Sequence, residues 1–176
     1  MKKITGLYIL ALLMTAPTAM SQDDAAKRYA AIETFKTSIV DKPLADFKFT
    51  SLDKQVLSLK KLKGKIIVIN FWFTYCGPCI KEMPFLTELV AANKENPVAF
   101  IAPAPENETQ IRKFLQKNTF TYQIVPSSLD YINSMHIENF PTHLVIDKDG
   151  IIRNAFVGYT DDIKMKLQEA IDKLLK

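Results

Sequence analysis

Cysteine is scarce in this sequence: 176 residues contain only two, Cys76 and Cys79, with two residues between them. Exported chains that rely on structural disulfides carry more cysteines at wider spacings. A bridge between such near neighbours closes a very short loop and adds little chain-entropy stabilisation. The shortage therefore argues against a disulfide framework and favours a redox-active pair.

The sequence also lacks a strong excess of charge of one sign and any stretch with the composition of a linker. The formal net charge is only +4, too small to indicate binding to nucleic acid or to a membrane surface. No Gly/Ser-rich or Pro-rich linker, internal repeat or low-complexity tract divides the chain. The roughly 155 residues that follow the leader suit one domain with one core.

The first 21 residues have the pattern of a secretory signal peptide. Lys2 and Lys3 precede a mostly apolar run at 4–16, and small residues follow up to a predicted cut after Ser21. The run is shorter than the about 20 residues of a membrane span, although an uncleaved N-terminal anchor stays an alternative. No cysteine lies near the cut, which excludes a lipoprotein anchor. Loss of the leader lowers the net charge from +4 to +2.

Alternating strand and helix patterns predict the fold class. Residues 22–43 form an N-terminal extension, with a helix expected near 24–40, and the domain proper is 44–176. The apolar run 66–73 has no polar alternation apart from Asn70, which is typical of a strand covered on both faces. The other expected elements are two short strands within 47–59, a helical turn at 59–64, strands at 98–101, 122–125, 142–146 and 151–157, and helices after Cys76, after Asn107, at 128–135 and from Thr160. Asn107, with Gln110 three residues on, resembles a capping box at the start of its helix.

Two of these helices carry specific expectations. In the helix after Cys76, Pro84 should introduce a kink, and Glu82 is expected on the polar side. In the last helix, Asp161 and Asp162 are expected in the first turn, where they would suit the helix dipole. With the hairpin turn at 147–150, the pattern predicts an α/β fold: a mixed central sheet, helices on both faces and an N-terminal β-hairpin.

The Cys76-Gly77-Pro78-Cys79 motif lies where a buried strand gives way to a helix. Free backbone N–H groups and the positive end of the dipole at a helix N-terminus both favour a thiolate at Cys76. A thiolate is the form that attacks disulfides, so Cys76, expected to be exposed at the turn, is the predicted nucleophile and the more shielded Cys79 resolves the mixed disulfide. Gly77 and Pro78 set the turn, since proline near a helix start loses no needed N–H.

Several motifs in order resemble the thioredoxin superfamily, and within it the exported TlpA/ResA-type thiol–disulfide oxidoreductases. They are Phe71-Trp-Phe-Thr-Tyr-Cys-Gly-Pro-Cys79, Lys81-Glu-Met-Pro84, Phe140-Pro-Thr142 and Ile146-Asp-Lys-Asp-Gly150, within a likeness that spans about 44–175. The resemblance implies a thioredoxin-like fold, a redox-active Cys76–Cys79 disulfide and no further cofactor.

The resemblance also implies roles for residues outside the motif. Pro141, between Phe140 and Thr142, is expected to be cis and to face the Cys76 sulfur. Asn70 stands where thioredoxin has a buried Asp and cannot carry protons as a carboxylate does. A loop Glu has that role in ResA-like relatives, which makes Glu106 the predicted proton acceptor for Cys79, with Glu108 as an alternative.

The aromatic residues before the motif and the two histidines are the remaining candidate site residues. Trp72 and Phe73 are expected to be core residues that shape the site, and Tyr75 a rim residue that contacts substrate. His136 and His143 have six residues between them, which misses the usual zinc spacing, so no metal site is predicted.

The expected function is that of an exported thiol–disulfide oxidoreductase in a bacterial envelope or periplasm. By family analogy it reduces disulfides of other exported proteins, such as apocytochrome c, and receives electrons from a membrane thiol carrier of the CcdA/DsbD type. An oxidant of thiols on the same fold is the main alternative, with a metal-binding carrier module next. Peroxide reduction is disfavoured because Phe73 stands where peroxiredoxins have a Thr.

Overall fold

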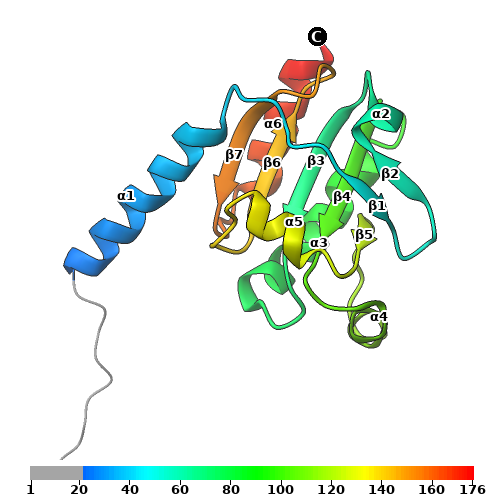
Figure 1. Cartoon of the computed structure of the whole chain (residues 1–176), viewed down its shortest axis with the longest axis horizontal. Coiled ribbons are helices and arrows are strands. Elements are labelled where there is room, and N and C mark those ends of the chain that lie inside the picture. The colour runs from blue at the N-terminus through cyan, green and yellow to red at the C-terminus, as the bar shows by residue number, and fades with distance from the viewer. Residues whose placement is uncertain (1–21) are drawn as a thin grey trace, which may run out of the picture.

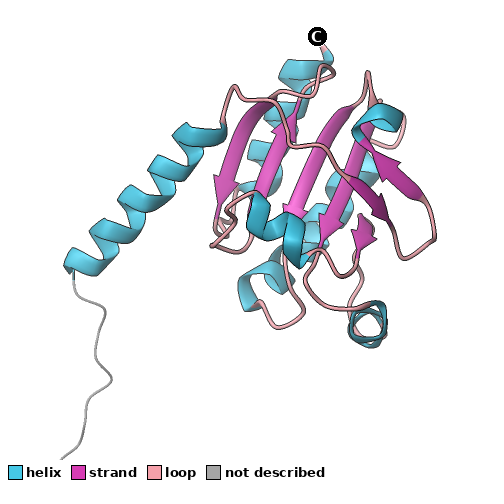
Figure 2. Cartoon of the chain, in the orientation of Figure 1, coloured by secondary structure: helices cyan, strands magenta, loops and turns pink. Residues whose placement is uncertain are grey.

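The computed structural model describes residues 22–176, so the predicted signal peptide lies outside the described residues. Helices and strands alternate along the chain much as the sequence predicts (Figures 1 and 2). In chain order they are α1 (Gln22–Ile39), β1 (Lys48–Thr50), β2 (Val56–Ser58), α2 (Leu59–Leu62), β3 (Ile66–Phe71), α3 (Gly77–Ala92), β4 (Val98–Pro103), α4 (Glu108–Leu115), β5 (Gln123–Val125), α5 (Leu129–Ser134), β6 (Thr142–Ile146), β7 (Ile152–Val157) and α6 (Ile163–Leu175).

A five-stranded mixed sheet forms the centre, in the order β5-β4-β3-β6-β7. The strands β3, β4 and β5 are parallel, whereas β6 is antiparallel to both β3 and β7. All six residues of β3 are buried, because helices cover both faces of this central strand. The short antiparallel pair β1–β2 forms a separate hairpin. The predicted mixed sheet with an N-terminal hairpin is thus confirmed.

Two apolar clusters lie on opposite faces of the sheet. On one face α3 and α6 pack against residues such as Val68, Leu86 and Leu167. On the other face the β1–β2 hairpin, α2 and α5 pack against residues such as Phe71 and Ile69. Figure 1 shows α5 in front of the sheet and α3 and α6 behind it. Residues that alternate along β3 therefore point alternately to these two layers.

Helix α1 projects away from the sheet (Figure 1). None of its residues is buried, and only its C-terminal part, with Phe35 and Ile39, packs against the core. A helix expected near 24–40 is therefore present. Within 22–176, no helix combines the length and the apolar character that a bilayer crossing requires.

Helix starts are predicted with mixed success. Asn107 caps α4 by accepting the Gln110 N–H at 3.0 Å, while the Gln110 side chain accepts the Asn107 N–H at 3.1 Å. The expected capping box is thus confirmed. Helix α6 begins only at Ile163, so the expectation that Asp161 and Asp162 lie in its first turn is wrong. Asp161 instead accepts a hydrogen bond from the Tyr159 hydroxyl, outside the helix.

Candidate active site

The Cys76–Cys79 disulfide lies at the junction of β3 and α3, with Cα atoms 5.2 Å apart. Cys76 is the N-cap residue of α3, and its Sγ accepts the Cys79 N–H at 3.2 Å. Pro78 occupies the first turn, where its missing N–H costs no helical hydrogen bond. The sulfur of Cys76 therefore takes the place that a capping oxygen has in other helices.

Both cysteines are nearly buried. Cys76 is 4% exposed and Cys79 only 1%. Cys79 is therefore the more shielded of the two, as predicted, but the expectation that Cys76 is exposed is wrong. The neighbours Tyr75, Gly77 and Pro78 are exposed, which places the disulfide directly beneath the surface. Gly77 does not have a positive φ, and a Cβ added to it would meet no atom within 4 Å, so the turn itself does not require glycine there.

The loop before β6 carries the second family motif. The Phe140–Pro141 peptide bond is cis, as predicted. Thr142 pairs with Phe71 of β3, so Pro141 enters the sheet at the end where β3 leads to Cys76. The Phe140 ring meets Phe73 edge-on at 5.2 Å, which joins this loop to the segment before the disulfide. A direct approach of Pro141 to the Cys76 sulfur stays a prediction.

Aromatic residues before the motif separate into a buried group and an exposed one. Trp72 is fully buried and packs against the rings of Phe114 and Phe120, so it supports the site from beneath and offers no surface to a substrate. Tyr75 is 87% exposed, as expected of a rim residue. It borders a groove of about 320 Å³, which we call the Tyr75 groove, lined by Thr74, Tyr75, Gln110, Lys113, Phe114, Lys117 and Asn118.

Glu106 contacts the segment that leads into the motif. Its Oε1 accepts both the backbone N–H and the hydroxyl of Thr74, each at 2.7 Å. Its Oε2 is buried and has no hydrogen-bond partner. The alternative Glu108 is bound to Lys54 and Arg112, whose hydrogen bonds hold the pKa of its carboxyl below the usual range. The geometry thus places Glu106, not Glu108, beside the active-site loop.

One buried acid was missed at the sequence level. Glu82, expected on the polar side of α3, is 0% exposed and hydrogen-bonded to Asn70 and His143, both also buried. Burial and, secondarily, the charge of Glu82 raise the pKa of Tyr122 well above its usual range. The signal was available: Glu82 lies three residues after Cys79 and four before Leu86, which is the spacing of a core-facing position.

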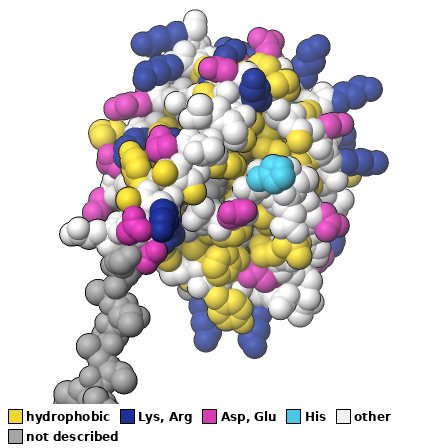
Figure 3. Space-filling view, turned by 60° about the vertical axis from the view of Figure 1, so that its left-hand side comes forward, with side chains coloured by type: hydrophobic (Ala, Val, Ile, Leu, Met, Phe, Trp, Pro, Cys, Tyr) yellow, Lys and Arg dark blue, Asp and Glu magenta, His cyan; other side chains and the backbone are white. Residues whose placement is uncertain are grey.

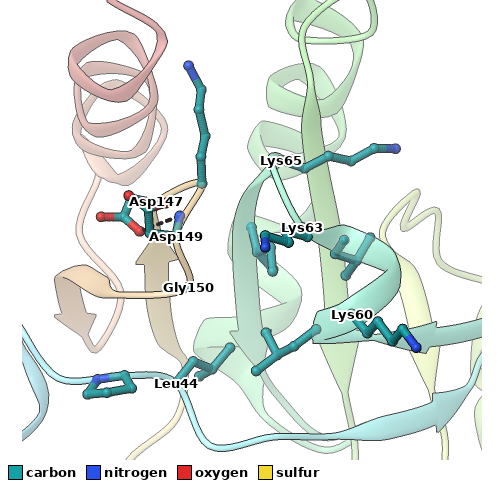
Figure 4. Close-up of a pocket in the computed structure, with 12 residues that line it drawn as sticks. Leu44, Lys60, Lys63, Lys65, Asp147, Asp149 and Gly150 are labelled. Carbon is teal, nitrogen blue, oxygen red and sulfur yellow. Dashed lines mark hydrogen bonds between the residues drawn. The ribbon is translucent and has the colours of Figure 1, made fainter.

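Other parts of the surface carry less chemistry. A second cavity of about 290 Å³ lies between α2 and the β6–β7 turn, beyond the opposite end of β3. Figure 4 shows the ammonium ends of Lys60 and Lys65 pointing away from Gly150, so they do not converge on a ligand there.

In Figure 3, acidic and basic side chains are intermingled over one face, in keeping with the modest net charge. Within the described part of the chain, no three His, Cys, Asp or Glu side chains are grouped so as to hold a metal ion.

A match to the Redoxin family covers residues 39–171, which include both cysteines, Pro141 and the whole sheet. The chain belongs to the Redoxin family. Its similarity to curated relatives extends over a stretch of comparable length. The thiol-disulfide oxidoreductase ResA of Bacillus cereus (strain ZK / E33L) is 32% identical over 137 residues, which cover 77% of this chain and 78% of that protein. ResA of Geobacillus thermodenitrificans (strain NG80-2) is 31% identical over 145 residues, or 80% and 83%.

Solved structures of this type agree with the fold. A thiol:disulfide interchange protein DsbE from Chlorobium tepidum superposes with a TM-score of 0.71 at 21% identity, covering 78% of this chain and 98% of that one, a likeness of fold alone. A thiol-disulfide oxidoreductase from Bacteroides vulgatus gives 0.66 at 26% identity, covering 78% and 97%. This Redoxin-family chain therefore has a thioredoxin-like fold and is a ResA-like thiol–disulfide oxidoreductase with a Cys76–Cys79 redox pair.

Proposed function

We propose that this oxidoreductase reduces disulfides in other exported proteins. The observation that carries the proposal is the position of the Cys76 sulfur as the N-cap of α3, accepting the Cys79 N–H at 3.2 Å. A thiolate in that place gains a charge-assisted hydrogen bond and lies at the positive end of the helix dipole. Gly77-Pro78 is the dipeptide of thioredoxin, a reductant of about −270 mV, which supports the reducing direction.

The reduced enzyme would act in two exchanges. The Cys76 thiolate attacks one sulfur of a substrate disulfide, a mixed disulfide forms, and the other substrate sulfur leaves as a thiolate that takes up a proton. The Cys79 thiol then loses its proton and attacks the Cys76 sulfur. The Cys76–Cys79 bond closes, and the second substrate sulfur leaves as a thiol. Two electrons pass from the enzyme dithiol to the substrate disulfide.

Glu106 is the proposed acceptor of the Cys79 proton. Its support is a buried, unpartnered Oε2 on a carboxylate that is tied by Oε1 to Thr74, two residues before Cys76. A positioned carboxylate of this kind can act as a general base. Tyr75, exposed beside the Tyr75 groove, is the proposed contact for residues that flank the substrate disulfide, and the Phe140–Pro141 loop would shape the opposite side of the site.

The cellular setting follows from the leader and the relatives. The predicted signal peptide supports export to a bacterial envelope or periplasm, either free after cleavage or held by its N-terminus. Such a compartment is oxidising, so a reductant there needs electrons from across the membrane. A membrane thiol carrier of the CcdA/DsbD type is the proposed donor. Disulfide-containing exported proteins, apocytochrome c among them, are the proposed substrates.

The deciding experiment measures the reduction potential of the Cys76–Cys79 pair and traps its intermediate. Equilibration with thiol buffers of known potential should give a value near thioredoxin's about −270 mV, whereas a value near DsbA's about −120 mV would make the protein an oxidant. Reduced Cys79→Ser should accumulate a mixed disulfide with a disulfide-containing peptide. Cys76→Ser should form none. A mixed disulfide that forms on Cys79 instead would reverse the assigned roles.

A further inference from the structure

Two exposed lysines line the Tyr75 groove beside the active-site disulfide. Lys113 belongs to α4, and Lys117 belongs to the turn that follows this helix. Two other cations, Arg112 and Lys54, are paired with Glu108 at the start of α4. In the described part of the chain, by contrast, neither Lys113 nor Lys117 forms an ion pair, and no acidic side chain lines the groove. The groove therefore carries positive charge that is not balanced locally.

The packing of α4 fixes these lysines on the groove side of the helix. Gln110, Lys113 and Lys117 follow one another at intervals of three and four residues, which places them along one side of a helix. Between them, the Phe114 ring packs 5.3 Å from the ring of the fully buried Trp72, so the helix cannot turn about its axis without breaking a core contact. The Lys117 N–H also bonds to the Phe114 carbonyl at 3.1 Å, which continues the turn beyond α4.

The groove begins next to the reacting sulfur. Tyr75 directly precedes Cys76, and Thr74 of the same segment is hydrogen-bonded to Glu106. One oxygen of Glu106 is occupied by Thr74 and the other is buried, so this acid is not among the residues that line the groove. The volume of about 320 Å³ is at the low end of the about 300–1,000 Å³ typical of ligand sites, which suits a short segment of chain.

We propose that Lys113 and Lys117 are specificity-determining residues that select substrates with an acidic residue close to the attacked cysteine. A carboxylate in the groove would be attracted by both ammonium groups, while apolar parts of the same segment pack against Tyr75 and Phe114. A lysine in that segment would be repelled, so the groove also disfavours basic substrates. This inference rests on the proposed function, because it specifies which protein disulfides the enzyme would reduce.

The test compares cyclic peptides that share one Cys-x-x-Cys disulfide and differ only in a short flanking segment of Glu, Gln or Lys. The segment precedes the ring in one set and follows it in the other. Acid quenching and mass spectrometry give the rate constant at which each peptide oxidises the reduced wild-type enzyme. In one set, the Glu peptide should react roughly five- to tenfold faster than the Lys peptide, as expected for two exposed ion pairs. Raising the ionic strength from about 20 mM to about 500 mM should largely remove the difference. Equal rates for the Glu and Lys peptides in both sets would overturn the proposal.

Charge reversal assigns the preference to the two lysines. Lys113→Glu combined with Lys117→Glu should make the Lys peptide react faster than the Glu peptide, a gain that a misfolded protein could not show. The matched control combines Lys60→Glu with Lys63→Glu, two exposed lysines beside the cavity at the opposite end of β3. The control has the same net charge as the first variant and should keep the wild-type preference. A reversal in both variants would show that net charge sets the preference, and the proposal would be wrong.

The two proposals fail in different ways. The same peptides are also assayed as dithiols with the oxidised enzyme, because both directions pass through a mixed disulfide on Cys76. If the Glu peptide is preferred in this direction but the reduced enzyme reduces no peptide, the proposed function is wrong and the selectivity of the groove stands. If the reduced enzyme reduces all the peptides at rates that do not depend on their charge, the selectivity is wrong and the function stands.

Discussion

Glu106 is tied to Thr74 by two hydrogen bonds on a single carboxylate oxygen, from the backbone N–H and from the hydroxyl, each 2.7 Å long. Thr74 is two residues before Cys76, so this acid holds the segment that leads to Cys76. The second oxygen of Glu106 is buried without a partner. One side chain therefore combines an anchoring oxygen with a buried oxygen that has no hydrogen-bond partner.

Replacing Glu106 by Gln separates these two functions. The amide of Glu106→Gln would keep an oxygen acceptor for Thr74 but could not take a proton, so the fold should persist while the closing step by Cys79 slows by roughly 10–100-fold near neutral pH. Stopped-flow measurement of mixed-disulfide resolution between about pH 6 and 9 gives the rate. Glu108→Gln, at an exposed and ion-paired acid two residues on, is the control and should leave the rate unchanged. Unaltered kinetics in Glu106→Gln would remove Glu106 from the mechanism.

Tyr75 should matter for large substrates and not for small ones. Its ring is 87% exposed beside the Tyr75 groove, whose rim carries Lys113 and Lys117. Tyr75→Ala should raise KM several-fold for a protein disulfide, because interface tyrosines contribute large contact area, and leave the reaction with oxidised glutathione unchanged. Tyr29→Ala, at a tyrosine of α1 that is 68% exposed, is the matched control. Equal losses with both substrates would assign Tyr75 to the architecture of the site instead.

Helix α4 depends on its cap. Asn107→Ala removes the side-chain acceptor of the Gln110 N–H and with it half of the capping box, which should lower the free energy of unfolding by about 1 kcal/mol. Urea denaturation measures the change. Asn107→Asp keeps the acceptor and should retain wild-type stability. A loss of the same size in both variants would show that the cap contributes nothing and that the amide group acts in another way.

The features that were predicted correctly are those set by residues close together in the sequence. Neighbouring residues or a matched motif were enough to predict four features: the strand β3, the capping box at Asn107, the redox pair and the cis bond before Pro141. The spacing of Glu82 from Cys79 and Leu86 indicated a core-facing position, but the buried partners of its carboxylate could not be foreseen in the same way. Its partners come from β3 and β6, and their register is fixed by pairing between segments 73 residues apart. A carboxylate is normally assigned to the surface unless such partners are known.

The start of α6 shows a second limit of the sequence. Asp161 and Asp162 had the composition of a first helical turn, yet the helix begins after them at Ile163. The Tyr159 hydroxyl donates to Asp161, and Lys81 of α3 lies 3.6 Å from the same carboxylate. Contacts with another helix therefore compete with the helix dipole for this acid, and only the tertiary structure shows which prevails.

Asp147 ties the β6–β7 turn together and should give the fold a defined acid sensitivity. Its Oδ1 accepts the N–H groups of Asp149 and Ile151, each at 2.9 Å, and its Oδ2 accepts from Arg153 Nε at 2.7 Å. Burial alone would raise the pKa of Asp147, but the hydrogen bonds from Ile151, Arg153 and Asp149 outweigh it and hold the pKa below its usual value. The charged form is thus favoured by folding, and the stability it contributes is present above about pH 4 and lost as the pH falls through the lowered value.

Asp147→Asn should therefore be less stable than the wild type at neutral pH, by roughly 1–2 kcal/mol, since hydrogen bonds to a charged acceptor are stronger than those to an amide. The difference should shrink as the pH approaches 3, because the wild-type carboxyl then becomes protonated as well. Urea unfolding of both proteins at pH 7 and at pH 3 measures it. Asp149→Asn, at an exposed position of the same turn, should show no such closing gap. If the gap between Asp147→Asn and the wild type is equal at both pH values, the hydrogen bonds of Asp147 act through geometry alone and not through its charge.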